Sequence, residues 1–234
     1  MEKARPRAFF VTGTDTEVGK TRVAASLLAA ARNAGLSTAA LKPVASGCDM
    51  HEAGLRNEDA LLLAQYCTLP LSYEQINPVA LRQAIAPHLA AASEGRTLQL
   101  DRLVGFARGV LMQRADVTVV EGAGGWRVPL NSREFLSGLP AALNMPVILV
   151  VGLKLGCINH AILTAEAILR DGLPLAGWVA NHLSADMPAA RDNLATLLDV
   201  LPAPCLGELP WAPAESPDDC ASQLDLGQLL ATSV

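Results

Sequence analysis

Short apolar runs alternate along this chain with longer segments rich in alanine and leucine. The apolar runs have the length of strands covered on both faces, and the longer segments have the composition of helices. The predicted strands are residues 8–11, 37–42, 117–120, 146–151, 176–180 and 205–209. The predicted helices are residues 22–31, 57–65, 87–94, 101–113, 159–170 and 189–201. This alternation predicts an α/β fold with a doubly wound, mainly parallel sheet and helices on both faces.

Two stretches stand apart from the alternation. Residues 44–47 read as a loop, and the proline-punctuated residues 68–86 have no clear assignment. Asn57 is a plausible N-cap for the helix that follows it, with Glu58 and Asp59 in the first turn. We find no repeat or linker, so the length of 234 residues favours one large domain, 1–234, over two small ones.

Composition and charge exclude several classes of function. Hydrophobic residues make up 51% of the chain and aromatic residues only 4%, which indicates a core of alanine, leucine and valine. A net charge of −5 argues against general affinity for nucleic acid or anionic membranes. The sequence shows no signal peptide and no apolar stretch of the roughly 20 residues that cross a bilayer. The five cysteines form neither a zinc pattern nor a disulfide framework, so we expect a cytoplasmic protein.

The stretch 13–21, Gly-Thr-Asp-Thr-Glu-Val-Gly-Lys-Thr, lies between the first predicted strand and the first predicted helix. Strand, glycine-bounded loop and helix beginning Gly-Lys-Thr is the context of a phosphate-binding loop, whose backbone N–H groups cradle phosphates. Five residues separate Gly13 from Gly19, one more than in the common pattern, so Thr14 occupies the first-glycine position. Lys20 can reach the β- and γ-phosphates, and the Thr21 hydroxyl can ligate Mg²⁺. The motif predicts a P-loop NTPase type of fold that binds a nucleoside triphosphate.

Further polar or glycine-rich segments follow the other predicted strands: residues 42–47, 121–125, 152–159, 181–182 and 210–211. The carboxyl ends of parallel strands meet at one edge of a sheet, where ligands bind in open α/β folds. We therefore expect these segments to converge with the phosphate loop on one site.

Glu121 ends an apolar strand, where a phosphate-binding domain carries its acidic metal residue, and Asp59 can supply a second carboxylate. Oxygen ligands of this kind suit Mg²⁺. The alternatives are an exposed strand-end acid for Glu121 and, for Asp59, a first-turn acid that stabilises the helix dipole. The glycines of 122–125 do not match the dinucleotide fingerprint and predict a loop shaped for close approach of a ligand.

Lys42 is a second basic candidate, although a lysine at a strand end is commonly only solvated. Ser46 follows it in a loop that contains Gly47, which strengthens the case. Residues 154–159 lead into a helix whose free N–H groups can hold a carboxylate, the alternative being a plain N-cap at Asn159.

Asn181 can present an amide oxygen and N–H groups to an adenine edge, and Trp211 offers a ring beside it. The histidines (His51, His88, His160, His182) and the cysteines Cys48 and Cys157 lack the spacing of metal ligands or a catalytic triad.

Taken together, these segments resemble the dethiobiotin synthetase family. The resemblance runs from about residue 8 to 212 and is carried by residues 11–21, 42–47, 120–126 (Val-Glu-Gly-Ala-Gly-Gly-Trp), 151–161 (Val-Gly-Leu-Lys-Leu-Gly-Cys-Ile-Asn-His-Ala), 176–181 and 206–211. It implies an ATP-dependent, Mg²⁺-requiring homodimeric ligase of biotin synthesis. The substrate 7,8-diaminopelargonic acid and CO₂ form a carbamate, the carbamate attacks the ATP γ-phosphate to give a carbamic–phosphoric anhydride, and the second amine closes the ureido ring, releasing ADP and phosphate.

The resemblance also implies roles for individual residues. Lys20 and Lys42 are catalytic, and the Mg²⁺ ligands are Thr21, Asp59 and Glu121. The nucleotide is bound by Glu17, Val18, Gly19, Lys20, Thr21, Asp59, Glu121, Gly122, Ala123, Gly124, Asn181, His182, Pro210, Trp211 and Ala212. The substrate is bound by Thr16 and Ser46, and its carboxylate by Gly156, Cys157, Ile158 and Asn159 of the neighbouring subunit.

Two rival functions stay open at this point. One is an amidoligase-like enzyme of the same superfamily that activates a different carboxylate. The other is a partitioning or metal-delivery NTPase that uses hydrolysis as a conformational switch. Such switches resemble Gly-Lys-Gly-Gly at the loop start, whereas here Thr14 follows Gly13 and no lysine precedes Lys20 in the loop. This difference counts against the switch.

Overall fold

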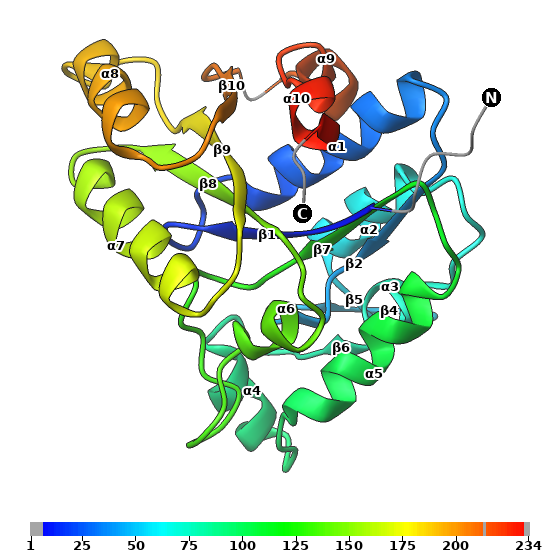
Figure 1. Ribbon diagram of the computed structural model, residues 1–234. Helices are drawn as coiled ribbons and strands as arrows, with labels where there is room; N and C mark the ends of the chain where they lie inside the picture. Colours follow the sequence, from blue (N-terminus) through cyan, green and yellow to red (C-terminus); the bar gives the residue numbers. More distant parts are fainter. Residues whose placement is uncertain (1–6, 213, 232–234) are drawn as a thin grey trace.

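A computed structural model describes residues 7–212 and 214–231. Its centre is a six-stranded sheet in the order β10-β9-β8-β1-β7-β2, and every strand pair in it is parallel (Figure 1). The strands are β1 (Arg7–Gly13), β2 (Thr38–Leu41), β7 (Val117–Glu121), β8 (Val147–Leu153), β9 (Leu175–His182) and β10 (Cys205–Leu209). The predicted parallel sheet is confirmed.

Helices cover both faces of this sheet, because successive strand residues point to opposite faces. In β1, Phe9 and Val11 belong to one buried cluster and Phe10 to the other. The first cluster includes residues of α1 (Lys20–Asn33), α2 (Glu58–Gln65), α9 (Pro217–Ala221) and α10 (Leu226–Ala231). The second includes residues of α4 (Pro87–Ser93), α5 (Leu100–Leu111), α6 (Gly138–Ala142), α7 (Cys157–Arg170) and α8 (Ala190–Val200). None of the described helices has the length and apolar character needed to span a membrane.

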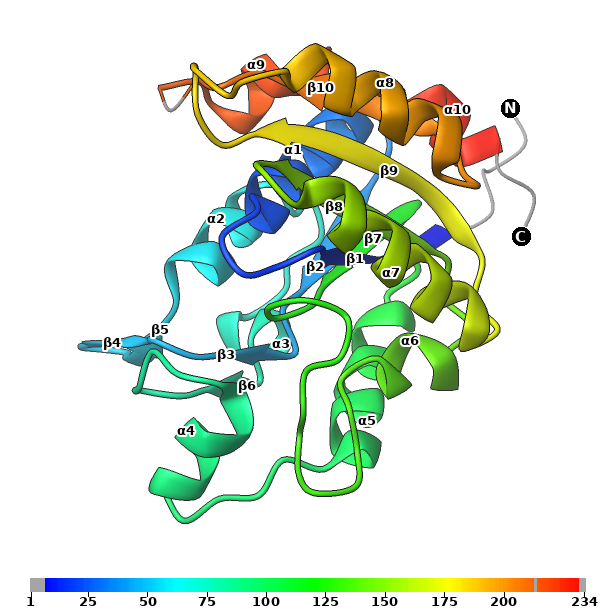
Figure 2. The same ribbon diagram turned by 90° about the vertical axis from the view of Figure 1, so that its left-hand side faces the viewer.

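The stretch between β2 and α4 carries elements that the sequence pattern does not predict. Residues 44–47 are not wholly a loop, because β3 (Val44–Ala45) pairs in parallel with β6 (Val79–Ala80). Within the unassigned residues, α3 (Tyr73–Ile76) begins at a capping box formed by Ser72 and Gln75. The antiparallel pair β4 (Asp49–His51) and β5 (Gly54–Arg56) projects from the side of the molecule (Figure 2). Two-residue strands and an exposed hairpin are too short for a periodic signal.

Two helix starts test the local predictions. Asn57 is the N-cap of α2, and its side chain accepts a hydrogen bond from the Ala60 N–H at 3.2 Å, as predicted. The predicted start of the helix at residue 159 is wrong by two residues. The helix α7 begins at Cys157, with Gly156 as its N-cap, and Asn159 lies inside it. Gly156 has a φ of 92°, a left-handed conformation that glycine adopts at little cost. This turn lets the helix begin earlier than its apolar pattern indicates.

Candidate active site

A cavity of about 810 Å³ opens beyond the carboxyl ends of β1, β2 and β7. Its walls come from the phosphate loop and α1, the segment after β2, α2, the start of α4 and the loop after β7. The lining residues include Thr16, Glu17, Gly19, Lys20, Thr21, Lys42, Ser46, Asp59, Glu121, Ala123 and Gly124. The structure therefore brings together most of the predicted phosphate, metal and substrate residues in one chain.

The phosphate loop turns sharply into α1. Glu17 and Gly19 both have positive φ angles, 58° and 89°, and α1 starts at Lys20. A Cβ on Gly19 would lie 2.2 Å from Asn181 Nδ2, so this position needs glycine for space as well as for conformation. The first turn of α1 contains no acidic residue, which leaves its N–H groups and positive dipole end available to an anion.

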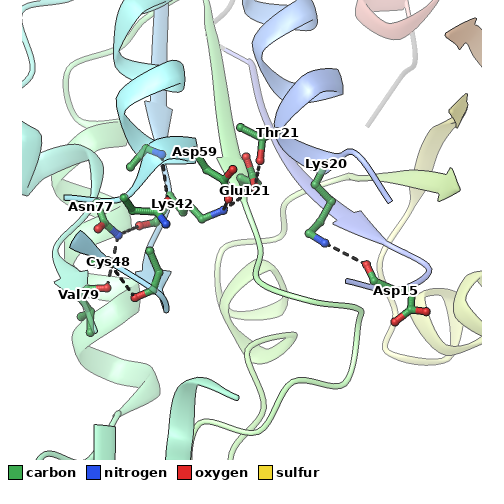
Figure 3. A network of polar contacts seen from close by, with 12 residues as sticks. Asp15, Lys20, Thr21, Lys42, Cys48, Asp59, Asn77, Val79 and Glu121 are labelled. Carbon is green, nitrogen blue, oxygen red and sulfur yellow. Dashed lines mark hydrogen bonds and ion pairs between the residues drawn. The ribbon is translucent and has the colours of Figure 1, made fainter. Parts of the chain in front are cut away.

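Lys20 is buried, and its ammonium donates a hydrogen bond to the backbone oxygen of Asp15 at 3.0 Å (Figure 3). Burial lowers the pKa of Lys20 to about 8, more than the nearby charge of Glu121 raises it. The nearby carboxylates do not fully offset the cost of burying the charged lysine. Phosphate oxygens in the cavity would add negative charge beside it, so the site suits an anion.

Lys42 lies in the same cavity, between two carboxylates (Figure 3). Its Nζ donates to Asp59 Oδ2 at 2.5 Å and to Glu121 Oε1 at 2.7 Å. Burial opposes the charged form of Lys42, but the charges of Glu121 and Asp59 outweigh it and raise the pKa of the lysine. Burial likewise opposes ionisation of Asp59, and the charge of Lys42 lowers the pKa of this carboxyl below its ordinary value. Lys42 is thus a buried, charged group of the site. This excludes the alternative that Lys42 is only a solvent-exposed lysine at the end of a strand.

The same cluster has a donor set that fits Mg²⁺. Glu121 is fully buried, its Oε1 accepts from the Thr21 hydroxyl at 2.9 Å, and its Oε2 has no hydrogen-bond partner within 7–212 and 214–231. One ammonium reaches both carboxylates, so they lie close enough to share a cation. No group of three or more His, Cys, Asp and Glu side chains placed for a metal occurs in the described chain. A magnesium ion here would combine Thr21 and the two carboxylates with phosphate and water oxygens.

Sequence reasoning missed two residues of the site, one that contacts the backbone of Lys42 and one in the cavity wall. Asn77, buried in the turn after α3, donates from Nδ2 to the backbone oxygen of Lys42 at 2.7 Å. Arg127 lines the cavity and forms a paired ion bridge to Asp171 at 2.6 and 2.7 Å. The Asn77-Pro78 dipeptide is a turn signal, but nothing in the pattern ties that turn to Lys42.

Ser46 and the glycine loop differ in how well they match their predicted roles. The Ser46 hydroxyl is buried in the cavity wall with no hydrogen-bond partner in the described part of the chain, so it is available to a substrate. Ala123 and Gly124 line the cavity. Gly122 is not among the lining residues, and a Cβ there would lie 2.9 Å from the Phe10 ring, so packing requires glycine at this position. Its contact with the nucleotide stays a prediction.

The predicted adenine residues lie beside the cavity, at the ends of β9 and β10. Asn181 and His182 are the last two residues of β9, not a segment beyond it. Asn181 is buried and donates from Nδ2 to the Val18 oxygen at 2.9 Å. His182 pairs with Glu208 at 2.6 Å, and Trp211 is 49% exposed. These residues adjoin the phosphate loop through the contact of Asn181 with Val18.

The predicted carboxylate site, Gly156 to Asn159, does not line the cavity of its own chain. Cys157 is buried, whereas Gly156 and Asn159 are exposed. The segment adjoins the phosphate loop through Lys154, whose ammonium lies 2.7 Å from Asp15 Oδ2. Within one chain, then, this segment and the cavity are separate.

Comparison with known proteins adds an independent line of information. Residues 7–218 match the family model described as AAA domain. The chain is 61% identical over 224 residues to the ATP-dependent dethiobiotin synthetase BioD of Cellvibrio japonicus, covering 96% of this chain and 98% of that protein. It is 61% identical over 222 residues to the protein of the same name from Pseudomonas paraeruginosa, covering 95% and 97%. Its fold is similar to the MinC:MinD cell division protein complex of Aquifex aeolicus, with a TM-score of 0.59, 14% identity and 97% of each chain covered.

Proposed function

The chain belongs to the dethiobiotin synthetase family, and we propose that it converts 7,8-diaminopelargonic acid, CO₂ and ATP into dethiobiotin, ADP and phosphate. The observation that carries this proposal is the cluster of Lys42, Asp59 and Glu121, which adjoins the phosphate loop through Thr21 in one cavity. It puts a charged lysine, a set of oxygen ligands and a phosphate cradle where one phosphoryl group can contact all three.

The first step joins one substrate amine to CO₂. The amine nitrogen attacks the carbon of CO₂ and loses a proton, which gives a carbamate. Thr16 and Ser46 lie in the cavity wall and are proposed to contact this end of the substrate. A hydroxyl can both donate to a carbamate oxygen and accept from an amine, so Ser46 suits a group that changes from one to the other.

The second step transfers the γ-phosphoryl group. A carbamate oxygen attacks the γ-phosphorus and ADP leaves, which forms the carbamic–phosphoric anhydride. Such transfer depends mainly on positioning and on stabilising charge. Lys20 and the N–H groups at the start of α1 hold the phosphates, and Lys42 is proposed to stabilise charge between carbamate and γ-phosphate. Mg²⁺ held by Thr21, Asp59 and Glu121 would neutralise charge on the phosphate oxygens.

The last step closes the ring. The second amine attacks the carbonyl carbon of the anhydride, the bond to phosphate breaks, and the ureido ring is complete. The cavity of about 810 Å³ is within the range of small-molecule sites, which suits holding both amines near the γ-phosphate.

We place the substrate carboxylate at Gly156 to Asn159 of a second subunit in a homodimer. Three features of the chain support this placement. The segment lies outside the cavity of its own chain, its N-cap is an exposed glycine, and the exposed leucines Leu155 (94%) and Leu163 (56%) flank Asn159 along the chain. Exposed leucines on either side of a helix start suit an interface between subunits.

The test of the overall reaction is ADP release with the diamine, bicarbonate and Mg²⁺, each omitted in turn. We expect turnover only with the complete mixture, and a ureido product of the diamine detected by mass spectrometry. ADP release at full rate without the diamine would contradict the proposal and favour a nucleotide-driven switch.

A further inference from the structure

Arg22 follows Thr21 in the first turn of α1, and its guanidinium reaches the ends of β9 and β10. Nη1 donates to Asn181 Oδ1 at 3.1 Å and to the backbone oxygen of Pro210 at 2.8 Å. Nη2 lies 3.4 Å from Glu215 Oε2 and donates to Cys220 Sγ at 3.3 Å. One side chain of the phosphate-binding helix therefore connects both segments assigned to the adenine with the C-terminal segment, which packs beside α1 (Figure 1).

The contacts of Arg22 and Val18 fix which way the Asn181 amide faces. Oδ1 accepts from Arg22, and Nδ2 donates to the Val18 oxygen at 2.9 Å. A turned-over amide would place its NH₂ group against the guanidinium and its oxygen against a carbonyl, which are two repulsive pairs. In the observed orientation one lone pair of Oδ1 and one N–H of Nδ2 remain for a ligand.

We infer that Arg22 is a positioning residue that makes the nucleotide site selective for a purine with a 6-amino group. The inference rests on the proposed placement of adenine at Asn181. A fixed Oδ1 can accept from the 6-amino group of adenine, but it meets a second acceptor in a 6-oxo purine. Without Arg22, the amide loses one of the two contacts that hold its orientation, and a turned-over NH₂ group can donate to a 6-oxo group.

The chain offers a matched control on the same helix. Arg32, in the last turn of α1, pairs with Asp218 of the same C-terminal segment at 2.6 Å and lies over the Tyr66 ring. Neither contact involves Asn181 or Pro210. Arg32→Met removes a tie between α1 and the C-terminal segment and leaves the base-reading amide unchanged. Glu215→Gln weakens the contact of the C-terminal segment with Arg22 but keeps the Arg22–Asn181 bond.

The experiment measures kcat/KM of the complete reaction with ATP and with inosine triphosphate, whose base carries a 6-oxo group. The ratio of the two values cancels any general loss of phosphate affinity or of folded protein. In Arg22→Met we expect the preference for ATP to fall about tenfold, mainly through KM for ATP, because a hydrogen bond between a charged and a neutral group is lost. Arg22→Lys keeps the positive charge but loses the two-pronged guanidinium group. We expect its ratio of kcat/KM values to lie between those of wild type and Arg22→Met. Arg32→Met and Glu215→Gln should keep the wild-type ratio.

Asn181→Ala separates the inference from the placement on which it rests. If Asn181→Ala lowers the ratio and both Arg22 variants leave it unchanged, the positioning role is wrong and the adenine placement stands. If Asn181→Ala also leaves the ratio unchanged, the base is not read at Asn181 and both statements fall. A fall in the ratio that is as large in Arg32→Met would overturn the inference by assigning the effect to the C-terminal segment as a whole.

Discussion

Two lysines in one cavity show how far residue type determines chemistry. The sequence predicts both Lys20 and Lys42 as basic groups of the site, and the structure places both there. Their environments are opposite, because burial dominates for Lys20 while two carboxylates surround Lys42. The motif establishes Lys20 from its neighbours in the chain. The environment of Lys42 is made by Asp59 of α2, Glu121 of β7 and Asn77. These residues are far from Lys42 in the chain, so the sequence around Lys42 does not predict this environment.

The lowered pKa of Lys20 predicts a pH-dependent cost to stability. Its pKa of about 8 in the folded protein lies below the ordinary 10.5 of an unfolded chain. Charged Lys20 therefore destabilises the nucleotide-free protein below pH 8, and the cost disappears as the pH rises from 8 toward 10.5. We expect Lys20→Met to have a free energy of unfolding about 1–3 kcal/mol higher than wild type at neutral pH. This difference should shrink as the pH rises from 8 toward 10.5. Urea denaturation of both proteins between neutral and alkaline pH measures it, and a gap that is constant with pH would contradict the prediction.

Lys42→Gln should reduce kcat about a hundredfold or more, because the lysine is proposed to stabilise charge that develops in the transition state. The dissociation constant of ADP should change far less. Steady-state kinetics and calorimetric titration give the two quantities. Arg32→Gln is the control, since it also removes a basic side chain paired to a carboxylate, Asp218, but lies outside the cavity. An equal loss of ADP affinity and of kcat/KM in Lys42→Gln would make the lysine an ordinary phosphate contact.

At the scale of elements, the sequence predicts what is regular and local. The six strands of the main sheet and the helices α1, α2, α4, α5, α7 and α8 follow from the pattern of apolar residues, whereas α3 and α6 do not. The N-cap of α2 follows from one residue type at one position. The short pairing of β3 with β6 lies beyond such signals, because it joins residues far apart in the chain by a two-residue ladder. Val44 and Ala45 of β3 line the cavity beside Ser46, so the proposed substrate side of the cavity is the part least accessible to prediction.

The helix α2 carries Asp59, one of the proposed Mg²⁺ ligands, so the N-cap of this helix should influence Mg²⁺ binding. Asn57→Ala removes the hydrogen bond from the Ala60 N–H and should lower the free energy of unfolding by about 1 kcal/mol. Fraying of the first turn should also raise the Mg²⁺ concentration that gives half-maximal turnover. Asn57→Ser restores a capping oxygen and should recover both values. Chemical denaturation and a Mg²⁺ titration of ADP release are the measurements. If Asn57→Ala is destabilised but needs no more Mg²⁺ than wild type, the N-cap does not influence Mg²⁺ binding.

At the scale of the molecule, one edge of the sheet collects segments from almost the whole chain. The phosphate loop, the segment after β2, the loop after β7 and the ends of β9 and β10 follow different strands and meet because all these strands are parallel. The sequence predicts this convergence from topology alone. The segment 152–159 also lies at this edge but outside the cavity, which is the reason a second subunit enters the proposal.

The dimer proposal predicts complementation between two inactive proteins. Lys42→Gln and Gly156→Trp should each be inactive, the second because a bulky side chain covers the exposed helix start. In a mixed dimer of the proposed kind, one site carries both changes and the other carries neither. Random reassortment makes about half the dimers mixed, so activity should recover to roughly a quarter of wild type. With subunit exchange shown independently, a mixture that stays inactive would place the carboxylate site within one chain.

The contact between Gly19 and Asn181 has a consequence for redesign of the enzyme. A Cβ on Gly19 would lie 2.2 Å from the Asn181 amide, so the phosphate loop and Asn181, which is proposed to bind the base, lie side by side with no room between them. Random libraries at position 181 should therefore yield functional clones only with side chains of asparagine's size or smaller. Larger residues at this position would push on Gly19 and so displace the loop that is proposed to hold the phosphates. A change of specificity toward a pyrimidine nucleotide would therefore require substitutions in the phosphate loop together with one at position 181. Libraries that vary position 181 alone should not yield such an enzyme.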